Sequence, residues 1–266
     1  MDLGISGRVA IVTGASKGIG RATARALAAE GAAVLLSARG VEALEETVAE
    51  LRAAGGDVEG VAADALDPRS AEGLRDAAVA RWGRVDIVVN NAGGGPEGND
   101  HVSRFAPEVW VDVFRLNVVT AMELTMACVP GMVSRRWGRV VNVSSTAGRD
   151  PDVRFGSYGA AKAALLHATR TTALAYAADG VLVNAVLPGL TRTDGVLSGY
   201  EEAAAATNRT PEDIERRMME RQPIAMGRTG RPEEVAGAIA FLCSEQAGWM
   251  TGVLLNVDGG TIKTLP

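Results

Sequence analysis

The sequence has few residues that could form disulfides or bind metals. Among 266 residues there are only two cysteines and two histidines. Cys128 and Cys243 lie far apart and make no disulfide framework, so we expect a reducing, cytoplasmic environment. The histidines and cysteines show no metal-ligand spacing, and no metal site is predicted. His101 is interpreted as a solvated loop residue.

The sequence also lacks an excess of positive charge and a long hydrophobic run. Its 27 Lys and Arg stand against 32 Asp and Glu, and its basic residues form only short clusters such as Arg135-Arg136. Nucleic acid is therefore not an expected partner. No apolar run reaches the ~18 residues of a membrane span, and the first residues lack the pattern of a signal peptide, so no membrane association is expected.

Short apolar runs alternate with longer helical patterns along the whole chain. Strands are expected at Val9–Val12, Ala33–Ser37, Val58–Ala62, Val85–Val89, Val140–Val143, Val181–Val186 and Val253–Val257. Helices are expected at Gly18–Glu30, Val41–Ala53, Arg69–Trp82, Pro107–Val133, Tyr158–Ala178 and Pro232–Cys243. This alternation predicts one α/β domain over residues 1–266, with a Rossmann-like, doubly wound parallel sheet of about seven strands flanked by helices.

The segment 194–222 interrupts the alternation because it is polar, charged and without a strand. It is either an inserted helical flap or a mobile loop. Glu201–Ala206 and Pro211–Arg221 are expected to form two short helices, the second with Thr210 as N-cap. We expect the segment to close over a substrate, and an inert surface insertion is the alternative.

A glycine-rich loop follows the first predicted strand and opens a helix. The sequence Thr13-Gly-Ala-Ser-Lys-Gly-Ile-Gly20 suits a strand–turn–helix joint that binds a diphosphate with backbone N–H groups. The second strand ends in Ala38-Arg39, where an NAD site would have an acidic residue. Lys17 and Arg39 without a carboxylate favour an adenosine 2′-phosphate, and hence NADP(H).

Tyr158 and Lys162 are four residues apart on a predicted helix and therefore share a face. A cation about 4 Å from a phenol contributes about 4 kcal/mol at an effective dielectric constant of ~20. That is enough to lower the phenol pKa by ~2–3 units, which would make Tyr158 useful as an acid–base group.

The motifs together resemble the short-chain dehydrogenase/reductase family, in particular its β-ketoacyl-acyl-carrier-protein reductase-like branch. They are Thr13–Gly20, Asn90-Asn-Ala-Gly93, Asn117, Ser145, Tyr158-x-x-x-Lys162, Pro188-Gly189, Thr251-Gly252 and Asp258-Gly-Gly260. The resemblance covers essentially the whole chain. It implies that Tyr158 is the general acid in carbonyl reduction and that Lys162 binds the nicotinamide ribose and lowers the pKa of Tyr158.

By the same resemblance, Ser145 orients the substrate carbonyl and Asn117 holds a water that links Lys162 to solvent. Ser144 is the rival for the serine role, and the thirteen-residue step to Tyr158 selects Ser145. The residues that the resemblance assigns to the cofactor, besides Tyr158 and Lys162, are Gly14, Ser16, Lys17, Gly18, Ile19, Gly20, Arg39, Asp64, Asn90, Ala92, Gly93, Pro188, Gly189, Thr191 and Thr193.

The implied activity is the NADPH-dependent reduction of a ketone to a secondary alcohol. Arg136 matches a basic residue that docks an acyl carrier protein, whereas Asp179 stands where a second docking arginine would be. A β-ketoacyl group and a free small-molecule carbonyl therefore both stay open as substrates. A non-catalytic NADP-binding regulator on the same fold is the alternative function. The family also implies a homotetramer, with a dimer as the alternative.

Overall fold

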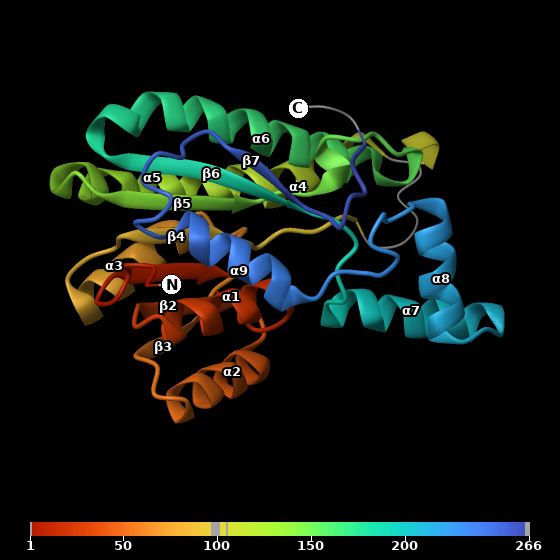
Figure 1. The fold of residues 1–266 in the computed structure, drawn as a ribbon, viewed down its shortest axis with the longest axis horizontal. Coiled ribbons are helices and arrows are strands. Elements are labelled where there is room, and N and C mark those ends of the chain that lie inside the picture. Colours follow the sequence, from red (N-terminus) through yellow and green to blue (C-terminus); the bar gives the residue numbers. More distant parts are fainter. Residues whose placement is uncertain (1, 97–101, 105, 264–266) are drawn as a thin grey trace.

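The computed structural model describes residues 2–96, 102–104 and 106–263 and contains one parallel sheet (Figure 1). The sheet has seven strands in the order β3-β2-β1-β4-β5-β6-β7. They are β1 (Val9–Thr13), β2 (Ala33–Ala38), β3 (Val58–Ala62), β4 (Ile87–Asn90), β5 (Gly138–Val143), β6 (Val181–Pro188) and β7 (Leu254–Val257). The strand order reverses between β1 and β4, which makes the sheet doubly wound, as predicted.

Helices cover both faces of the sheet. The α-helices are α1 (Gly18–Ala29), α2 (Val41–Ala53), α3 (Ser70–Trp82), α4 (Pro107–Phe114), α5 (Thr120–Arg135), α6 (Gly156–Tyr176), α7 (Asp194–Thr207), α8 (Pro211–Arg221) and α9 (Pro232–Leu242). Alternate residues of each strand face opposite cores: Val12 packs beneath α1, α2 and α9, whereas Ile11 packs beneath α3, α5 and α6. This two-sided burial explains why the inner strands are apolar throughout.

The predicted helix Pro107–Val133 forms as one helical stretch, Pro107–Arg135, with an irregular turn inside it. A π-helical turn, Arg115–Val119, separates α4 from α5 and places Asn117 in the wide part of the turn. By length and composition, the stretch Pro107–Arg135 could cross a membrane. Leu124 and Met132 of this stretch pack into the core against the sheet, whereas Val111, Phe114 and Met126 are exposed.

The flap 194–222 is helical over most of its length, as expected, but its first helix is longer than predicted. It begins at Asp194 instead of Glu201, because the Thr193 side chain accepts a hydrogen bond from the Val196 N–H and caps α7. The second helix has the predicted bounds and the predicted cap at Thr210. Figure 1 shows α7 and α8 together at one end of the molecule, beyond the sheet.

A buried polar network crosses the middle of the sheet. Asn90 on β4 donates to Asn142 on β5 at 2.8 Å and to Thr125 on α5 at 2.9 Å. Asn142 donates in turn to Thr169 on α6 at 2.9 Å. These four side chains are all buried, and the network fixes α5 and α6 relative to the strands that end at the candidate site.

Replacing Asn142 tests this network. Asn142→Ala leaves the buried Asn90 amide with only one of its two acceptors and removes the donor to Thr169, so we expect a loss of about 2–4 kcal/mol in the free energy of unfolding. Urea unfolding measures it. The control is Glu46→Ala, an exposed position within α2, which should change stability by less than about 1 kcal/mol. Equal effects of the two substitutions would contradict a stabilising role of the network.

Candidate active site

A cavity of about 340 Å³ lies at the carboxyl ends of the central strands. Loops after β1, β4, β5 and β6 meet there, as expected at the reversal point of a doubly wound sheet. Its lining residues come from six parts of the chain and include Ile19, Gly93, Ser145, Tyr158, Lys162, Pro188, Gly189, Thr191 and Thr193. Residues distant in sequence thus form one concave surface.

Ser145, Tyr158 and Lys162 lie together in this cavity. Tyr158 and Lys162 project from the first turns of α6, and Ser145 follows the end of β5. The Ser145 and Tyr158 side chains are hydrogen-bonded to each other. The Lys162 ammonium donates to the Val143 carbonyl at 2.8 Å and lies 5.5 Å from the centre of the Tyr158 ring.

The hydrogen bonds distinguish the two adjacent serines. Ser144 is buried, and its hydroxyl donates to the backbone carbonyl of Lys162 at 3.0 Å. Ser145 contacts Tyr158 and also accepts a hydrogen bond from the Ala147 N–H at 3.1 Å. Ser144 therefore joins β5 to α6, whereas the Ser145 hydroxyl is next to the phenol.

The pKa values of Tyr158 and Lys162 differ from what the attraction between a phenolate and an ammonium alone predicts. Burial raises the pKa of Tyr158, and the hydrogen bond from Ser145 offsets that increase only in part. Burial also lowers the pKa of Lys162 to about 8. Both shifts have one cause, since loss of water penalises a phenolate and an ammonium alike. In this structure desolvation outweighs the attraction that we expected to lower the pKa of Tyr158.

The Gly93-Gly94 segment connects Asn117 with Lys162. Its side chain accepts from the Gly94 N–H at 3.1 Å and donates to the Gly94 and Val113 carbonyls at 2.7 and 2.8 Å. A Cβ atom at Gly93 would lie 2.5 Å from the Asn117 side-chain oxygen and 3.1 Å from the Lys162 amine. Glycine at position 93 thus permits Asn117 and Lys162 to approach the same point of the chain.

The glycine-rich loop has the close packing that a nucleotide-binding joint requires. Gly14 and Gly18 have φ values of +63° and +56°, which favour glycine. A Cβ atom at Gly20 would lie 2.2 Å from the Gly14 carbonyl oxygen. The loop therefore brings the first turn of α1 against its own backbone and carries no side chain of its own at positions 14, 18 and 20, which fits a bound diphosphate.

The residues expected to bind the adenosine part of the cofactor lie in the glycine-rich loop and at the end of β2. Lys17 and Arg39 are both exposed, and Ala38 offers no carboxylate. The Ala15 N–H donates to the Ser37 carbonyl at 3.0 Å, so the glycine-rich loop is joined to the end of β2 just before Arg39. Ser16 is joined to α2, because its carbonyl accepts from the Thr47 hydroxyl at 3.1 Å.

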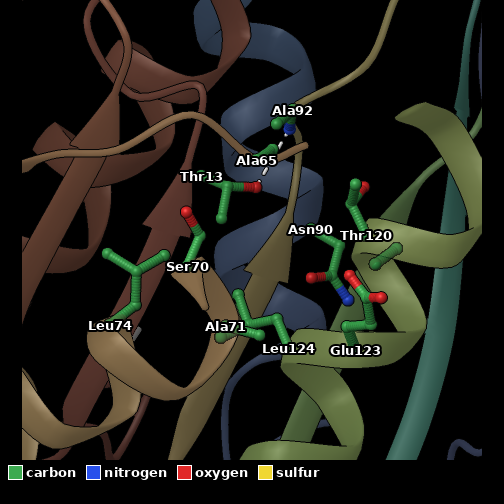
Figure 2. A pocket seen from close by; sticks show the side chains of 11 residues that line it. Thr13, Ala65, Ser70, Ala71, Leu74, Asn90, Ala92, Thr120, Glu123 and Leu124 are labelled. Atoms are coloured by element: carbon green, nitrogen blue, oxygen red, sulfur yellow. Dashed lines mark hydrogen bonds between the residues drawn. The ribbon is translucent and has the colours of Figure 1, made fainter. Parts of the chain in front are cut away.

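A second, much smaller cavity of about 20 Å³ lies between β4, α3 and α5 (Figure 2). Ala65 and Ala92 border it at the carboxyl edge of the sheet. Asp64 is exposed next to it and accepts a hydrogen bond from the Leu66 N–H. The Asn90 side chain belongs to the buried network of the sheet, so its hydrogen bonds suit a bracing role better than direct contact with a cofactor.

Some lining residues carry no sequence motif that pointed to them. Phe155 packs edge-on against Tyr158, with ring centres 6.3 Å apart, and Val196 and Gln222 reach the cavity from the two ends of the flap. Asn91 was predicted only as part of a loop, yet it donates to the carbonyls of Thr13 and Gly14 at 2.9 and 3.1 Å. His101 lies outside the described residues.

Comparisons with known proteins agree with this arrangement. Residues 8–203 match the family model of short chain dehydrogenases. A putative ketoacyl reductase of the monensin polyketide synthase of Streptomyces virginiae is 40% identical over 255 residues, which cover 95% of this chain and 96% of that protein. The chain thus belongs to the short-chain dehydrogenase family, and it is an oxidoreductase of that family.

Two solved structures share both fold and length with the chain. L-sorbose reductase from Gluconobacter frateurii, complexed with NADPH and L-sorbose, superposes with a TM-score of 0.95 at 34% identity, covering 100% of both chains. A variant of actinorhodin polyketide ketoreductase with NADPH gives a TM-score of 0.89 at 37% identity, covering 97% of this chain and 98% of the other. The two neighbours differ in their named substrates.

The lowered pKa of Lys162 predicts a pH-dependent stability. Lysine has a pKa near 10.4 when solvated, so between pH 8 and 10 the unfolded chain binds this proton and the folded chain releases it. Stability from this group must therefore rise with pH across that window, by about 2 kcal/mol. Urea unfolding of wild type and Lys162→Met, without added nucleotide, gives the difference at each pH. If the free energy of unfolding changed with pH in the same way in both proteins, the lowered pKa of Lys162 would be contradicted.

Proposed function

We propose that the protein is an NADPH-dependent ketoreductase that reduces a carbonyl compound to a secondary alcohol through Ser145, Tyr158, Lys162 and Asn117. The observation that carries the proposal is the hydrogen-bonded Ser145–Tyr158 pair in a cavity shared with the buried Lys162 amine. A non-catalytic nucleotide-binding regulator would not need an acid, a carbonyl-orienting hydroxyl and a buried cation at one point.

Each side chain has a distinct role in this proposal. When bound, NADPH supplies the hydride. The Ser145 hydroxyl donates to the substrate oxygen and holds it next to Tyr158, and the raised pKa of Tyr158 keeps the phenol protonated as a general acid at neutral pH. Lys162, charged below pH about 8, stabilises the phenolate that remains after proton transfer and binds ribose hydroxyls. Asn117 positions the Gly93-Gly94 backbone beside Lys162.

The cofactor assignment rests on the residues at the end of β2 and in the glycine-rich loop. Lys17 and Arg39 are exposed cations, and Ala38 cannot accept hydrogen bonds from the two ribose hydroxyls of NAD. A 2′-phosphate would be attracted to the same cations. The NADPH complexes of the two structural neighbours support this choice.

The substrate that we favour is a free small-molecule ketone. The guanidinium of Arg136, the one basic residue expected to dock an acyl carrier protein, donates to the Ala178 carbonyl at 2.9 Å, directly before Asp179. This exposed arginine thus holds on to the turn that contains Asp179, whose carboxylate would repel an acidic carrier. A β-ketoacyl substrate remains the second candidate, because the monensin relative is named a putative ketoacyl reductase.

The flap 194–222 is the lid of the substrate cavity in this proposal. Val196 and Gln222, at its two ends, line the cavity together with Tyr158. Tyr200 and Ala204 of α7 are buried, whereas α8 buries no residue completely. The flap is thus held at α7 and weakly held at α8, as expected of a segment that opens and closes.

A homo-oligomer follows from the apolar residues exposed on neighbouring helices. Val111 and Phe114 on α4, Met126 on α5 and Leu174 on α6 are exposed by 66%, 44%, 38% and 85%. Such a surface favours association with a second copy of the chain. We propose a tetramer, with a dimer as the smaller alternative.

The proposed acid is tested by Tyr158→Phe. Removing only the hydroxyl should reduce ketone turnover with NADPH by ~10²–10⁴-fold, the usual contribution of general acid catalysis, while nucleotide binding persists. Tyr176→Phe is the matched control, because Tyr176 lies on the same helix with its hydroxyl near Met126. NADPH oxidation is followed by absorbance with a panel of ketones. Near-normal turnover of Tyr158→Phe would show that another group is the acid.

The proposed cofactor is tested by kcat/KM with NADPH and NADH. We expect at least a tenfold preference for NADPH, about 1.4 kcal/mol, because only NADPH carries the phosphate that pairs with Lys17 and Arg39. The double substitution Ala38→Asp and Arg39→Leu should remove or reverse the preference. Arg81→Leu, which removes an exposed arginine at the far end of α3, should leave it unchanged. Equal rates with both cofactors in the wild type would overturn the assignment.

A further inference from the structure

Asp194, at the start of the flap, contacts the glycine-rich loop directly. Its carboxylate accepts a hydrogen bond from the Gly18 N–H at 2.8 Å, although the two residues are 176 positions apart. The neighbouring Thr193 packs on the same glycine, since a Cβ atom at Gly18 would lie 3.1 Å from the Thr193 Cβ atom. The flap therefore begins on the first turn of α1.

The N-terminus of α1 needs such a partner from outside the helix. The N-cap residue Lys17 makes no side-chain cap hydrogen bond, and the first turn of α1 contains no acidic residue. The first N–H groups of a helix lack intrahelical acceptors and carry partial positive charge. Asp194 supplies both an acceptor and a negative charge. Because Asp194 also lies in the first turn of α7, one carboxylate serves two helix N-termini.

This contact connects two parts of the proposed site. Gly18 belongs to the loop that we assign to the cofactor diphosphate, and Val196, two residues after Asp194, lines the substrate cavity. The rest of the flap is attached through the buried Tyr200 and Ala204 of α7 and through polar contacts of α8. Glu215 of α8 accepts from the Thr229 hydroxyl at 2.7 Å and lies 3.6 Å from the Arg192 guanidinium. A shift of the first turn of α7 would therefore move the cavity wall.

We infer that Asp194 is a positioning residue that fixes the lid to the cofactor loop through the Gly18 N–H, so that nucleotide binding in the loop alters the position of the lid. This inference rests on the proposed function, because it takes the loop as the cofactor site and the flap as the lid. Asp194 touches neither substrate nor reacting atoms in this role, and it acts through α7.

Three variants separate the hydrogen bond from the charge and from general flap stability. Asp194→Ala removes the acceptor, and Asp194→Asn keeps an acceptor without the charge. Asp213→Ala is the matched control, because Asp213 is also a first-turn carboxylate of a flap helix but pairs with Arg216 within α8. Asp194 is exposed, so all three variants should fold, and melting temperatures within ~2 °C of the wild type would verify it.

Hydrogen exchange with and without NADPH is the primary measurement, and it needs no turnover. In the wild type and in Asp194→Asn, NADPH should slow exchange across residues 196–221. In Asp194→Ala, exchange there should be faster from the start and should not respond to NADPH, although a fluorescence titration still shows binding. Asp213→Ala should raise exchange only in α8 and keep the response to NADPH. An Asp194→Ala protein with wild-type exchange and response would overturn the inference.

Steady-state kinetics provide the second readout. Loss of one hydrogen bond to a charged acceptor should raise the ketone KM of Asp194→Ala by about fivefold or more, with kcat within about threefold of wild type. Asp194→Asn should restore KM. A kcat that falls together with an unchanged KM would contradict a positioning role. If wild type reduces no ketone but its flap exchange depends on Asp194 as stated, the proposed function fails and the positioning role stands.

Discussion

The Thr13 hydroxyl holds together the two loops on which the site depends. It accepts hydrogen bonds from the N–H groups of Asn91 and Ala92, both at 3.0 Å, while Asn91 donates to the Thr13 and Gly14 carbonyls. The glycine-rich loop after β1 and the segment after β4 are thereby fixed to each other at the point where the strand order reverses (Figure 2). Gly93, two residues beyond Asn91, packs against the Asn117 and Lys162 side chains, so their positions depend on the same segment.

Exclusion of water from the cavity is the second constraint, because it shifts the pKa values of the ionisable side chains there. Burial moves the pKa of Tyr158 up and that of Lys162 down, so each group is driven toward its neutral form. A protonated phenol suits proton donation, and a lysine with a pKa of about 8 is still mainly an ammonium at neutral pH but loses its charge about two pH units earlier than a solvated lysine. The proposed chemistry therefore depends on partners that favour the ammonium, of which the Val143 carbonyl is one.

Much of the fold could be predicted because the sheet is buried on both faces. Apolar β-branched runs located all seven strands, and α2 and α8 have the predicted bounds. Errors occur where a distant contact decides the local structure. Periodicity predicted the helical stretch 107–133 but not the π-turn within it, where the Asn117 side chain is hydrogen-bonded to Gly94, 23 residues away. The early start of α7 depends on its cap and on the contact between Asp194 and Gly18.

In the candidate site, too, residues placed by local sequence were predicted, and residues placed by distant contacts were not. Tyr158 and Lys162 are close in sequence, so helical spacing alone places them on one face. Assigning roles to Ser145 and Asn117 required the family resemblance, because nothing local to either residue points to the cavity. Val196 and Gln222 were not predicted to line the cavity, since their positions follow from the docking of the whole flap.

The flap and the core are held in place by different interactions. Buried hydrogen bonds fix the side chains proposed for the reaction, whereas exposed polar contacts hold the part of the flap proposed to select the substrate. Ser144 and Lys162 tie β5 to α6 by buried hydrogen bonds, and the Asn90–Asn142 network braces the same elements. Substitutions there carry the full cost of an unsatisfied buried group. α8 buries no residue completely and is attached through polar contacts, so its sequence can change at little cost to the fold. The shape of the cavity can therefore vary through the flap while the Ser145–Tyr158 pair stays constant.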